Sequence, residues 1–209
     1  LVKLEPVTVS AVDGDGATVE HTFYMSQFGP IADLGGLSAL LGGWPTFNGT
    51  IFAFTDANKE NLRGLENWIN SGQAENLGDI LEATKTIGIP WVNTLAADRH
   101  GEGLYADISA VPNASQALID SCVRPPFGPV ILAAGGGIVS LDGSDSNCQL
   151  GNDEGAPSNL LGYDNLPKLR TTEYGANAND SYWLANPRKL LTGFTRAIGQ
   201  EEYEQSIRT

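Results

Sequence analysis

The stretch Trp91-Val92-Asn93-Thr94-Leu95-Ala96-Ala97-Asp98 lies at the centre of the predicted fold, and the neighbouring elements are placed around it. It mixes small, apolar and polar residues and continues into Arg99-His100-Gly101, which together with Asp98 is a turn signal. A second stretch of similar composition follows from Gly103 to Ser109. Two such stretches around one short turn predict an antiparallel β-hairpin over residues 91–109.

Two amphipathic helices are predicted immediately before this hairpin. The first begins at Asp56-Ala57-Asn58 and ends at about Ser71, and its apolar stripe consists of Leu62, Leu65, Trp68 and Ile69. The second runs from about Asn76, a preferred capping residue, to Ile87, and its stripe consists of Leu77, Ile80, Leu81 and Thr84. Both stripes are expected to contact the core, and neither indicates a cofactor site.

Further strands are predicted ahead of the helices. Residues 2–12 and 17–27 alternate loosely and are separated by Asp13-Gly14-Asp15-Gly16, a strong hairpin signal. The sequence Thr50-Ile51-Phe52-Ala53-Phe54-Thr55 predicts a buried strand. The order strand, strand, helix, helix, strand, strand indicates an α+β fold.

The segment from residue 113 to 168 is predicted to be a long loop-rich insertion, because proline recurs through it. A loop of this length inside a compact domain is usually functional or wrapped around another part of the protein. The sequence begins at Leu1 in a strand-like pattern and ends at Ile207-Arg208-Thr209 without a closing feature. We therefore expect residues 1–209 to be an internal portion of one domain of a longer chain.

Charge and hydropathy exclude several classes of partner. The 209 residues include 12 basic and 25 acidic side chains, for a formal net charge of -13. Such an excess of negative charge argues against nucleic acid and against anionic membrane surfaces as partners. No apolar run approaches the roughly 20 residues that a membrane span needs.

Metal and cofactor sites are not expected. Cys122 and Cys148 lie in polar surroundings without zinc-type spacing, so they form either a disulfide, which implies an oxidising compartment, or two buried thiols. The stretch Asp142-Gly143-Ser144-Asp145-Ser146-Asn147 is interpreted as a polar surface loop. His21 and His100 lack nucleophile or carboxylate companions in the sequence and are expected to face solvent.

The densest group of short polar side chains is Asn177-Ala178-Asn179-Asp180-Ser181-Tyr182-Trp183-Leu184-Ala185-Asn186-Pro187. A carboxamide donates hydrogen bonds without carrying charge, so one Asn of the pair could hold an oxyanion while the other braces the loop. Two alternatives are an Asx-rich turn and an N-glycosylation site at Asn179. The glycosylation pattern also occurs at Asn48-Gly49-Thr50 and Asn113-Ala114-Ser115.

Several of these stretches occur in an order that resembles the β chain of the penicillin acylase family, and most of all its acyl-homoserine lactone and aculeacin-type acylases. The resemblance extends from about residue 21 to 209. Its motifs are Asp56-Ala57-Asn58-Lys59-Glu60-Asn61, Ile89-Pro90-Trp91-Val92-Asn93-Thr94-Leu95-Ala96-Ala97-Asp98, Gly103-Leu104-Tyr105, Val111-Pro112, residues 177–187 and Leu191-Thr192-Gly193-Phe194.

The resemblance implies part of an αββα sandwich of the N-terminal-nucleophile hydrolases. In that family a precursor cuts itself, and the freed Ser at the start of the β chain attacks an amide carbonyl with its own α-amino group as base. By motif match, Asn179 corresponds to the Asn whose side chain holds the oxyanion. Cys122 and Cys148 fall where related acylases carry a disulfide, which implies a periplasmic or secreted enzyme. The implied partners are a small acyl-amide substrate and the α chain of the same precursor.

This sequence departs from the family pattern at its ends. It begins at Leu1 and not at Ser, so we expect these 209 residues alone to be inactive. Arg208-Thr209 resembles the start of a segment whose arginine lies near the site in relatives. The predicted function is hydrolysis of a linear amide between an acyl chain and a polar head such as a homoserine lactone, a lipopeptide or a β-lactam nucleus. One alternative is a non-catalytic acylase-like binding or scaffold protein. A second is a secreted all-β binding domain, against which the two predicted helices argue.

Overall fold

A computed structural model describes residues 2–33, 49–133, 138–177, 182–186 and 188–193. The chain divides into two compact units, Leu1–Asp56 and Ala57–Thr209, and each is described by itself. Asn179, Arg208 and the glycosylation pattern at Asn48 lie outside the described residues. No helix in the described part of the chain is long and apolar enough to cross a membrane.

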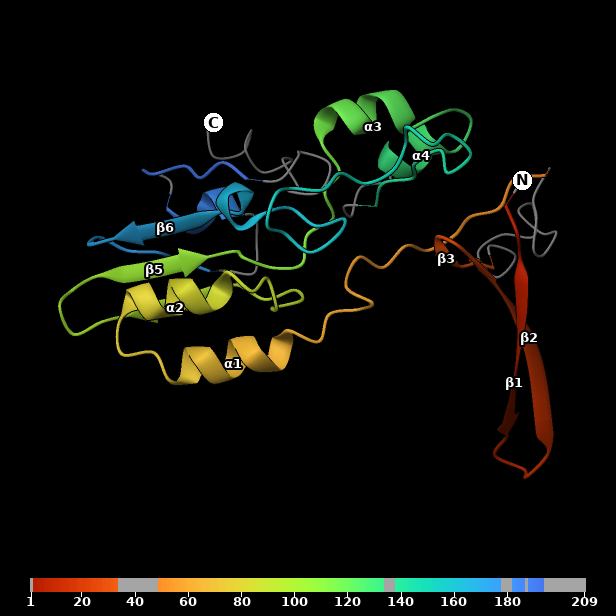
Figure 1. The fold of residues 1–209 in the computed structure, drawn as a ribbon, viewed down its shortest axis with the longest axis horizontal. Helices are drawn as coiled ribbons and strands as arrows, with labels where there is room; N and C mark the ends of the chain where they lie inside the picture. The colour runs from red at the N-terminus through yellow and green to blue at the C-terminus, as the bar shows by residue number, and fades with distance from the viewer. Residues whose placement is uncertain (1, 34–48, 134–137, 178–181, 187, 194–209) are drawn as a thin grey trace. The chain divides into compact units, whose positions relative to one another are not determined.

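The first unit is built on the predicted hairpin. Strands β1 (Glu5–Val12), β2 (Thr18–Ser26) and β3 (Gly29–Pro30) form an antiparallel sheet in the order β1-β2-β3 (Figure 1). At the turn, Asp13 Oδ1 accepts hydrogen bonds from the backbone N–H groups of Asp15 at 3.0 Å and Ala17 at 2.9 Å. The turn signal in the sequence therefore acts through a carboxylate that binds backbone donors.

The two faces of this hairpin differ in chemistry. Val7 pairs with Phe23 and Val9 pairs with His21 on one face, and all four side chains are exposed. On the other face, Thr8 and Thr22 share a hydrogen bond of 3.0 Å between their hydroxyl groups. The exposed position of His21 confirms the prediction for that residue.

The predicted buried strand over residues 50–55 is wrong. Between described residues this segment makes an isolated bridge, of Ala53 with Ile31, and Phe54 is 67% exposed. Among the described residues the segment pairs with the short stretch around β3 and Ile31: the Ala32 N–H donates to the carbonyl of Phe52 at 2.7 Å and the Phe54 N–H donates to the carbonyl of Pro30 at 2.8 Å, and no longer ladder forms there. A Cβ at Gly29 of β3 would lie 2.2 Å from the carbonyl oxygen of Phe54, so a side chain there would separate the two segments.

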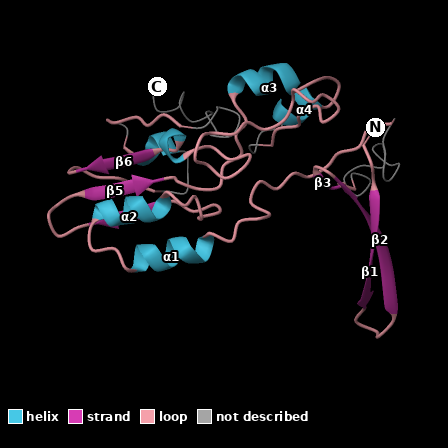
Figure 2. Ribbon diagram, in the orientation of Figure 1, coloured by secondary structure: helices cyan, strands magenta, loops and turns pink. Residues whose placement is uncertain are grey.

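The second unit contains the predicted central hairpin. Strands β4 (Thr94–Ala97), β5 (Gly103–Ala106) and β6 (Lys168–Thr171) form an antiparallel sheet with β5 in the middle (Figure 2). In the turn, Asp98 Oδ1 accepts from the backbone N–H groups of His100 at 2.8 Å and Glu102 at 3.0 Å. His100 is exposed on this turn, as predicted.

Helix α2 (Leu77–Thr84) begins where predicted and ends three residues before the predicted end at Ile87. The side chain of Asn76 caps it by accepting a hydrogen bond of 3.1 Å from the backbone N–H of Asp79. Leu77 and Thr84 are buried, and Ile80 and Leu81 pack against the same core. The predicted stripe is therefore a core contact.

Helix α1 (Gly64–Gly72) starts later than predicted. Ahead of it, the side chain of Asn61 donates to Asn58 at 2.7 Å and to the carbonyl of Gly88 at 2.9 Å, so these side chains hold a turn in place of a first helical turn. The stripe predicted to be core is exposed, at 90% for Leu62, 72% for Leu65, 60% for Trp68 and 50% for Ile69.

A polar side chain joins the two helices instead of that stripe. Asn67 of α1 is 1% exposed, and its Nδ2 donates to the carbonyl of Ala83 in α2 at 2.9 Å. The apolar stripe points away from this contact, since Leu65 is two positions from Asn67 on the helix. The prediction that the stripe contacts the core is therefore wrong for this chain.

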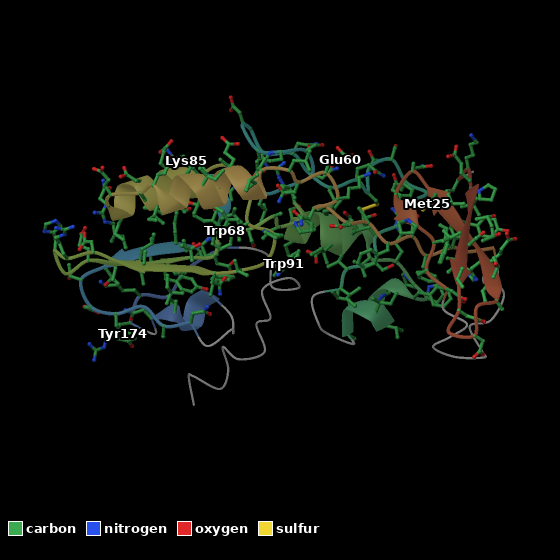
Figure 3. The ribbon with its side chains drawn as sticks, turned by 90° about the horizontal axis from the view of Figure 1, so that it is seen from below. Met25, Glu60, Trp68, Lys85, Trp91 and Tyr174 are labelled. Carbon is green, nitrogen blue, oxygen red and sulfur yellow. A yellow bond between two sulfur atoms is a disulfide. The ribbon has the colours of Figure 1, made fainter. Side chains whose placement is uncertain are left out.

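The sheet carries packed side chains on both faces. Leu104 and Ala106 belong to the main core with Leu77 of α2. Tyr105, which alternates with them along β5, packs on the other face against Tyr182 and Ala185. Figure 3 shows the helices on one side of the sheet and the segment of Tyr182 on the other. The unit is thus α+β, as predicted.

The segment from 113 to 168 contains short helices among its loops. They are α3 (Gln116–Cys122), α4 (Gly128–Ala133) and the 3-10 helix η2 (Tyr163–Asn165). Cys122 and Cys148 form a disulfide, which confirms that alternative over two free thiols. Arg124 lies 3.1 Å from Asp142 and 2.8 Å from Asp145, so its guanidinium organises the polar loop that the sequence predicted at the surface.

Candidate functional site

The stretch that carries the paired asparagines is a loop closed at its base. The backbone N–H of Ala176 donates to the carbonyl of Ala185 at 2.8 Å. Asn186, which is fully buried, donates from Nδ2 to the carbonyl of Tyr174 at 2.9 Å and accepts at Oδ1 from the N–H of Arg188 at 3.0 Å. These bonds fix both ends of the loop, and Asn179 lies between them in the part that the structure does not describe.

An aromatic contact anchors the returning half of this loop to the sheet. Tyr182 begins the 3-10 helix η3 (Tyr182–Ala185), and it is 6% exposed where it packs against Tyr105 of β5. The chain then turns back closely, because a Cβ at Gly193 would lie 2.3 Å from Cγ of Pro167, which precedes β6. The returning half of the loop, from Tyr182 to Ala185, is thus seated on the face of the sheet opposite the helices.

Asn177 lies outside the strands and starts the part of the loop that leads to Asn179. Its Oδ1 accepts a hydrogen bond of 3.1 Å from Nδ2 of Asn93, which directly precedes β4. Asn177 therefore braces the loop, which is one of the two roles predicted for the pair. Sequence reasoning did not find Asn93, since the two residues are 84 positions apart.

Two more polar groups lie on the same face of the sheet. Burial raises the pKa of Asp107 to about 6, and a hydrogen bond with Ser109 opposes that rise. Burial, followed by the charge of Asp107, raises the pKa of Tyr105, and the Tyr105 hydroxyl has no hydrogen-bond partner among the described residues. Asp107 directly follows β5, and the strand's period of two, continued by one residue, sets it on the face of Tyr105, so the sequence contained this signal.

The glycosylation pattern at Asn113 lies in another part of the fold, away from the loop of Asn177. Asn113 is 7% exposed, and its Nδ2 donates to Asp153 Oδ1 at 2.7 Å. A glycan acceptor needs an exposed amide, so Asn113 is a structural residue in this fold. The pattern at Asn179 lies outside the described residues.

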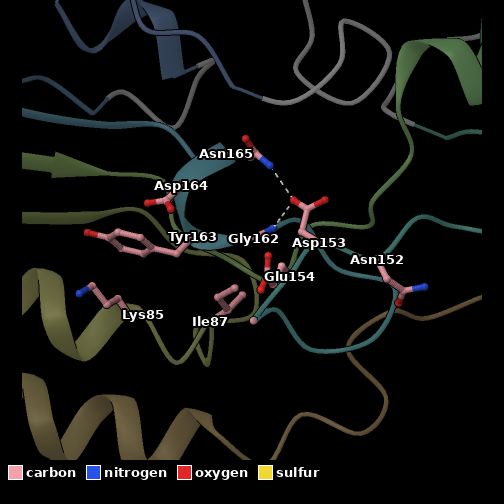
Figure 4. Close-up of a pocket in the computed structure, with 10 residues that line it drawn as sticks. Lys85, Ile87, Asn152, Asp153, Glu154, Gly162, Tyr163, Asp164 and Asn165 are labelled. Carbon is pink, nitrogen blue, oxygen red and sulfur yellow. Dashed lines mark hydrogen bonds between the residues drawn. The ribbon is translucent and has the colours of Figure 1, made fainter.

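A cavity of about 670 Å³ lies between the end of α2 and η2 (Figure 4). At its wall, Asp153 Oδ2 accepts from the N–H of Gly162 and from Nδ2 of Asn165, both at 2.7 Å. The Gly162 N–H, then Asn165 and Asn113, lower the pKa of this carboxyl. The carboxylate is thus occupied in holding loops together, and none of the residues that line the cavity belongs to the loop of Asn177.

Metal binding finds no support in the described part of the chain. No group of three or more His, Cys, Asp or Glu side chains there is arranged to hold a metal ion. The chemistry available in the described residues is that of neutral amides, the partly buried carboxyl of Asp107 and the buried phenol of Tyr105. Such a set can position a polar substrate and donate hydrogen bonds to it.

A sheet with two helices on one face and an amide-bearing loop on the other defines an α+β protein with a polar loop site. Comparison with known proteins makes the class more specific. The family model described as penicillin amidase matches residues 2–209, so the chain belongs to the penicillin amidase family.

Individual relatives agree with this assignment. The chain is 38% identical over 209 residues to aculeacin-A acylase of Actinoplanes utahensis and 37% identical over 209 residues to acyl-homoserine lactone acylase PvdQ of Pseudomonas fluorescens. Each match covers 97% of this chain and 25% of the relative, so the chain spans about a quarter of the length of these proteins.

A solved structure of a thermostable penicillin G acylase from Alcaligenes faecalis shares the fold. Its TM-score is 0.57 at 16% sequence identity, and the match covers 99% of this chain and 32% of that one. At this identity the likeness concerns the fold alone.

Proposed function

We propose that this chain is part of an acylase that hydrolyses the amide bond between an acyl chain and a polar head. The observation that carries the proposal is the family match over residues 2–209, together with relatives named as acylases at 38% and 37% identity. A homoserine lactone is the head group that the name of one relative states, and a lipopeptide is a second candidate, carried over from the resemblance to aculeacin-type acylases. A β-lactam nucleus is a third candidate, suggested by the family name.

Asn179 is the residue that we assign to the oxyanion. Attack on an amide carbonyl concentrates negative charge on its oxygen, and a neutral carboxamide donor can stabilise that charge at a fixed position. The closed base of the loop supports this role, because Ala176, Ala185 and Asn186 hold both ends of the segment that carries Asn179. Donors that are preorganised cost little reorganisation when the charge develops.

The nucleophile in this proposal is a Ser at the start of the β chain, freed when the precursor cuts itself. Its own α-amino group is the base that accepts the hydroxyl proton. The α chain of the same precursor and the rest of the β chain complete an αββα sandwich around these residues. The exposed stripe of Leu62, Leu65, Trp68 and Ile69 on α1 supports further packing, because such apolar patches usually mark interfaces.

The compartment that we propose is the periplasm or the outside of the cell. The disulfide between Cys122 and Cys148 supports it, since disulfides persist in oxidising environments. Intact mass with thiol alkylation, before and after reduction, measures the state of both thiols in the protein purified from its natural compartment. Two thiols alkylated without reduction would contradict the proposal.

The experiment that tests the activity uses the full-length protein and a set of N-acyl amides with homoserine lactone, lipopeptide and β-lactam heads. Release of the free amine, together with a mature chain whose first residue is Ser, is the expected result. Binding of these compounds without amine release, in a protein that lacks a Ser, Thr or Cys at the processed terminus, would indicate a non-catalytic acylase-like protein instead.

A further inference from the structure

We propose that one face of the hairpin of β1 and β2 is a docking surface for a part of the same polypeptide that lies outside residues 1–209. This apolar hairpin face consists of Val7, Val9, Ala11, Val19, His21 and Phe23. The inference goes beyond the proposed function, because it rests on the family membership and on the length of the chain and not on the reaction.

The register of the two strands gathers these side chains into one row. The cross-strand pairs are Val7 with Phe23, Val9 with His21, and Ala11 with Val19. Alternate residues of a strand point to the same face, so the three pairs lie next to one another. The rings of His21 and Phe23 make an edge contact with 4.5 Å between their centroids. The valines at 7, 9 and 19 and Phe23 are 42–52% exposed, so about half of the surface of each is available for burial.

The opposite face of the hairpin has the chemistry of a solvated surface. Besides the bond between Thr8 and Thr22, the Ser10 hydroxyl donates to the Glu20 carboxylate at 3.1 Å. Antiparallel strands alternate in this way where one face of the sheet packs on a core and the other meets water. Among the described residues, however, Ile31 is the only buried hydrophobic side chain of the first unit. The hairpin thus has a core-facing pattern, and the described part of its unit does not supply the core.

The length of the third strand shows why a covering layer is needed. A two-stranded hairpin is marginally stable in water unless a further strand or a packed layer supports it. Strand β3 pairs only with Met25 and Ser26, at the end of β2 (Figure 1). The hairpin therefore needs cover in every folded molecule, which favours a layer of the same polypeptide over a separate partner that binds and leaves.

The relatives show that such a polypeptide has the length to supply this layer. The matches cover 97% of this chain but only 25% of aculeacin-A acylase and of acyl-homoserine lactone acylase PvdQ. The docking surface also defines the chemistry of the layer. It must present apolar side chains to the valines and Phe23, and a hydrogen-bond acceptor to His21, because a ring N–H that is buried without a partner is costly.

The face of the hairpin, and not its edge, is the surface that fits. Among the described residues, β1 forms the edge of its sheet. The Asp13 N–H donates to the carbonyl of Ala17, so hydrogen-bonded pairs continue at every second residue and the backbone of Pro6 points away from β2. Proline has no N–H and is tolerated in a sheet where its position faces outward. This edge therefore lacks a donor that an added strand would use.

The first test measures cover on the two faces of the hairpin in the full-length protein. The matched variants are Val9→Cys on the apolar hairpin face and Ser10→Cys on the polar face, and both positions are exposed in the first unit. Cys122 and Cys148 form a disulfide and do not compete for the reagent. We expect alkylation of Val9→Cys to be at least about 10-fold slower than that of Ser10→Cys in the native protein, and equal in denaturant. Equal rates in the native protein would overturn the inference.

The second test identifies the covering layer. The photoreactive analogue p-benzoylphenylalanine replaces Phe23 in the full-length protein, which is then irradiated and digested. We expect the crosslinked peptide to come from outside residues 1–209 of the same molecule. Crosslinks confined to residues 1–209 would overturn the inference. A crosslink to a second copy, which a mixture of isotopically light and heavy protein reveals, would also overturn it.

Two controls separate this inference from a folding defect and from the proposed function. Each variant is compared with the parent by its thermal midpoint, and where Val9→Cys lowers it, Val7→Cys and Thr8→Cys replace the first pair with the same expectation. Amine release is measured on the same preparations. A protected apolar hairpin face without amine release would leave this inference standing and remove the proposed function, whereas amine release with equal alkylation rates would do the reverse.

Discussion

Replacing Asp153 by alanine should loosen the loops that meet at this carboxylate. Its two oxygens accept hydrogen bonds from the Gly162 N–H, from Nδ2 of Asn165 and from Nδ2 of Asn113, each at 2.7 Å. The bonds to Gly162 and Asn113 are partly buried, and the bond to Asn165 is exposed. Water can replace the carboxylate at Asn165, but it reaches the other two donors less easily.

The magnitude follows from the two partly buried bonds. A hydrogen bond to a charged group contributes about 1.5–3 kcal/mol, and we take the lower value because Asp153 is only partly buried. Two such bonds give about 3 kcal/mol, which corresponds to roughly 100-fold faster local opening. The control is Glu154→Ala, an exposed neighbour that should change stability by less than about 0.5 kcal/mol.

Hydrogen exchange measured on a peptide that contains Gly162 is the assay, because that amide is one of the three donors. The pKa of Asp153 is lowered in the folded state, so its stabilisation is present above the unfolded pKa of about 4 and is lost as pH falls through the folded pKa. The difference between parent and variant should therefore shrink in acid. Equal exchange in parent and Asp153→Ala near neutral pH would refute the reasoning.

Three further outcomes are expected in the full-length protein. Replacing Cys122 and Cys148 by alanine should lower the free energy of unfolding by about 3.5 kcal/mol, since the disulfide closes a sequence separation of 26; no loss in chemical denaturation would contradict this. A thiol introduced by Leu65→Cys should be protected from alkylation by the rest of the protein, whereas a thiol introduced by Asn70→Cys on the polar side of α1 should react. Equal alkylation rates of the two thiols would show that the rest of the protein does not cover the stripe. Burial raises the pKa of Asp107 to about 6, so the free energy of unfolding should fall as pH rises from about 4 to 6. The variant Asp107→Asn should therefore have a higher thermal midpoint than the parent at about pH 7.5 but not at about pH 4. The same pH dependence in variant and parent would contradict this.

Local signals account for the parts of the fold that the sequence predicted well. Both hairpins have a turn in which an aspartate, Asp13 or Asp98, binds backbone N–H groups, and α2 begins at the capping side chain of Asn76. These interactions involve residues at most four positions apart. A single sequence therefore contains all the information that they require.

Features that depend on distant neighbours were predicted less well. The stripe on α1 is amphipathic as predicted, but periodicity does not say what covers it, and in this chain Asn67 makes the buried contact instead. The run ending at Phe54 has the composition of a buried strand, yet among the described residues it makes an isolated bridge, from Ala53 to Ile31, beside the two-residue strand β3. In each case the environment that would bury the apolar residues is not encoded in the segment itself.

The candidate site likewise has parts that the sequence predicted and parts that depend on distant neighbours. Motif similarity pointed to Asn179 and to the loop around it, and the disulfide of Cys122 and Cys148 is present. The contact of Asn93 with Asn177 spans 84 positions and becomes visible only when the sheet has brought the two together. Long-range pairs of this kind have no local signal in a single sequence.

Whether Asn179 holds the oxyanion is tested most directly by the kcat of the full-length enzyme carrying Asn179→Ala, measured as amine release from an N-acyl amide. Loss of one oxyanion donor should lower kcat by about 100-fold or more, with the fold intact by thermal midpoint. Near-parental turnover in a folded variant would contradict the assignment of Asn179 and the mechanism built on it.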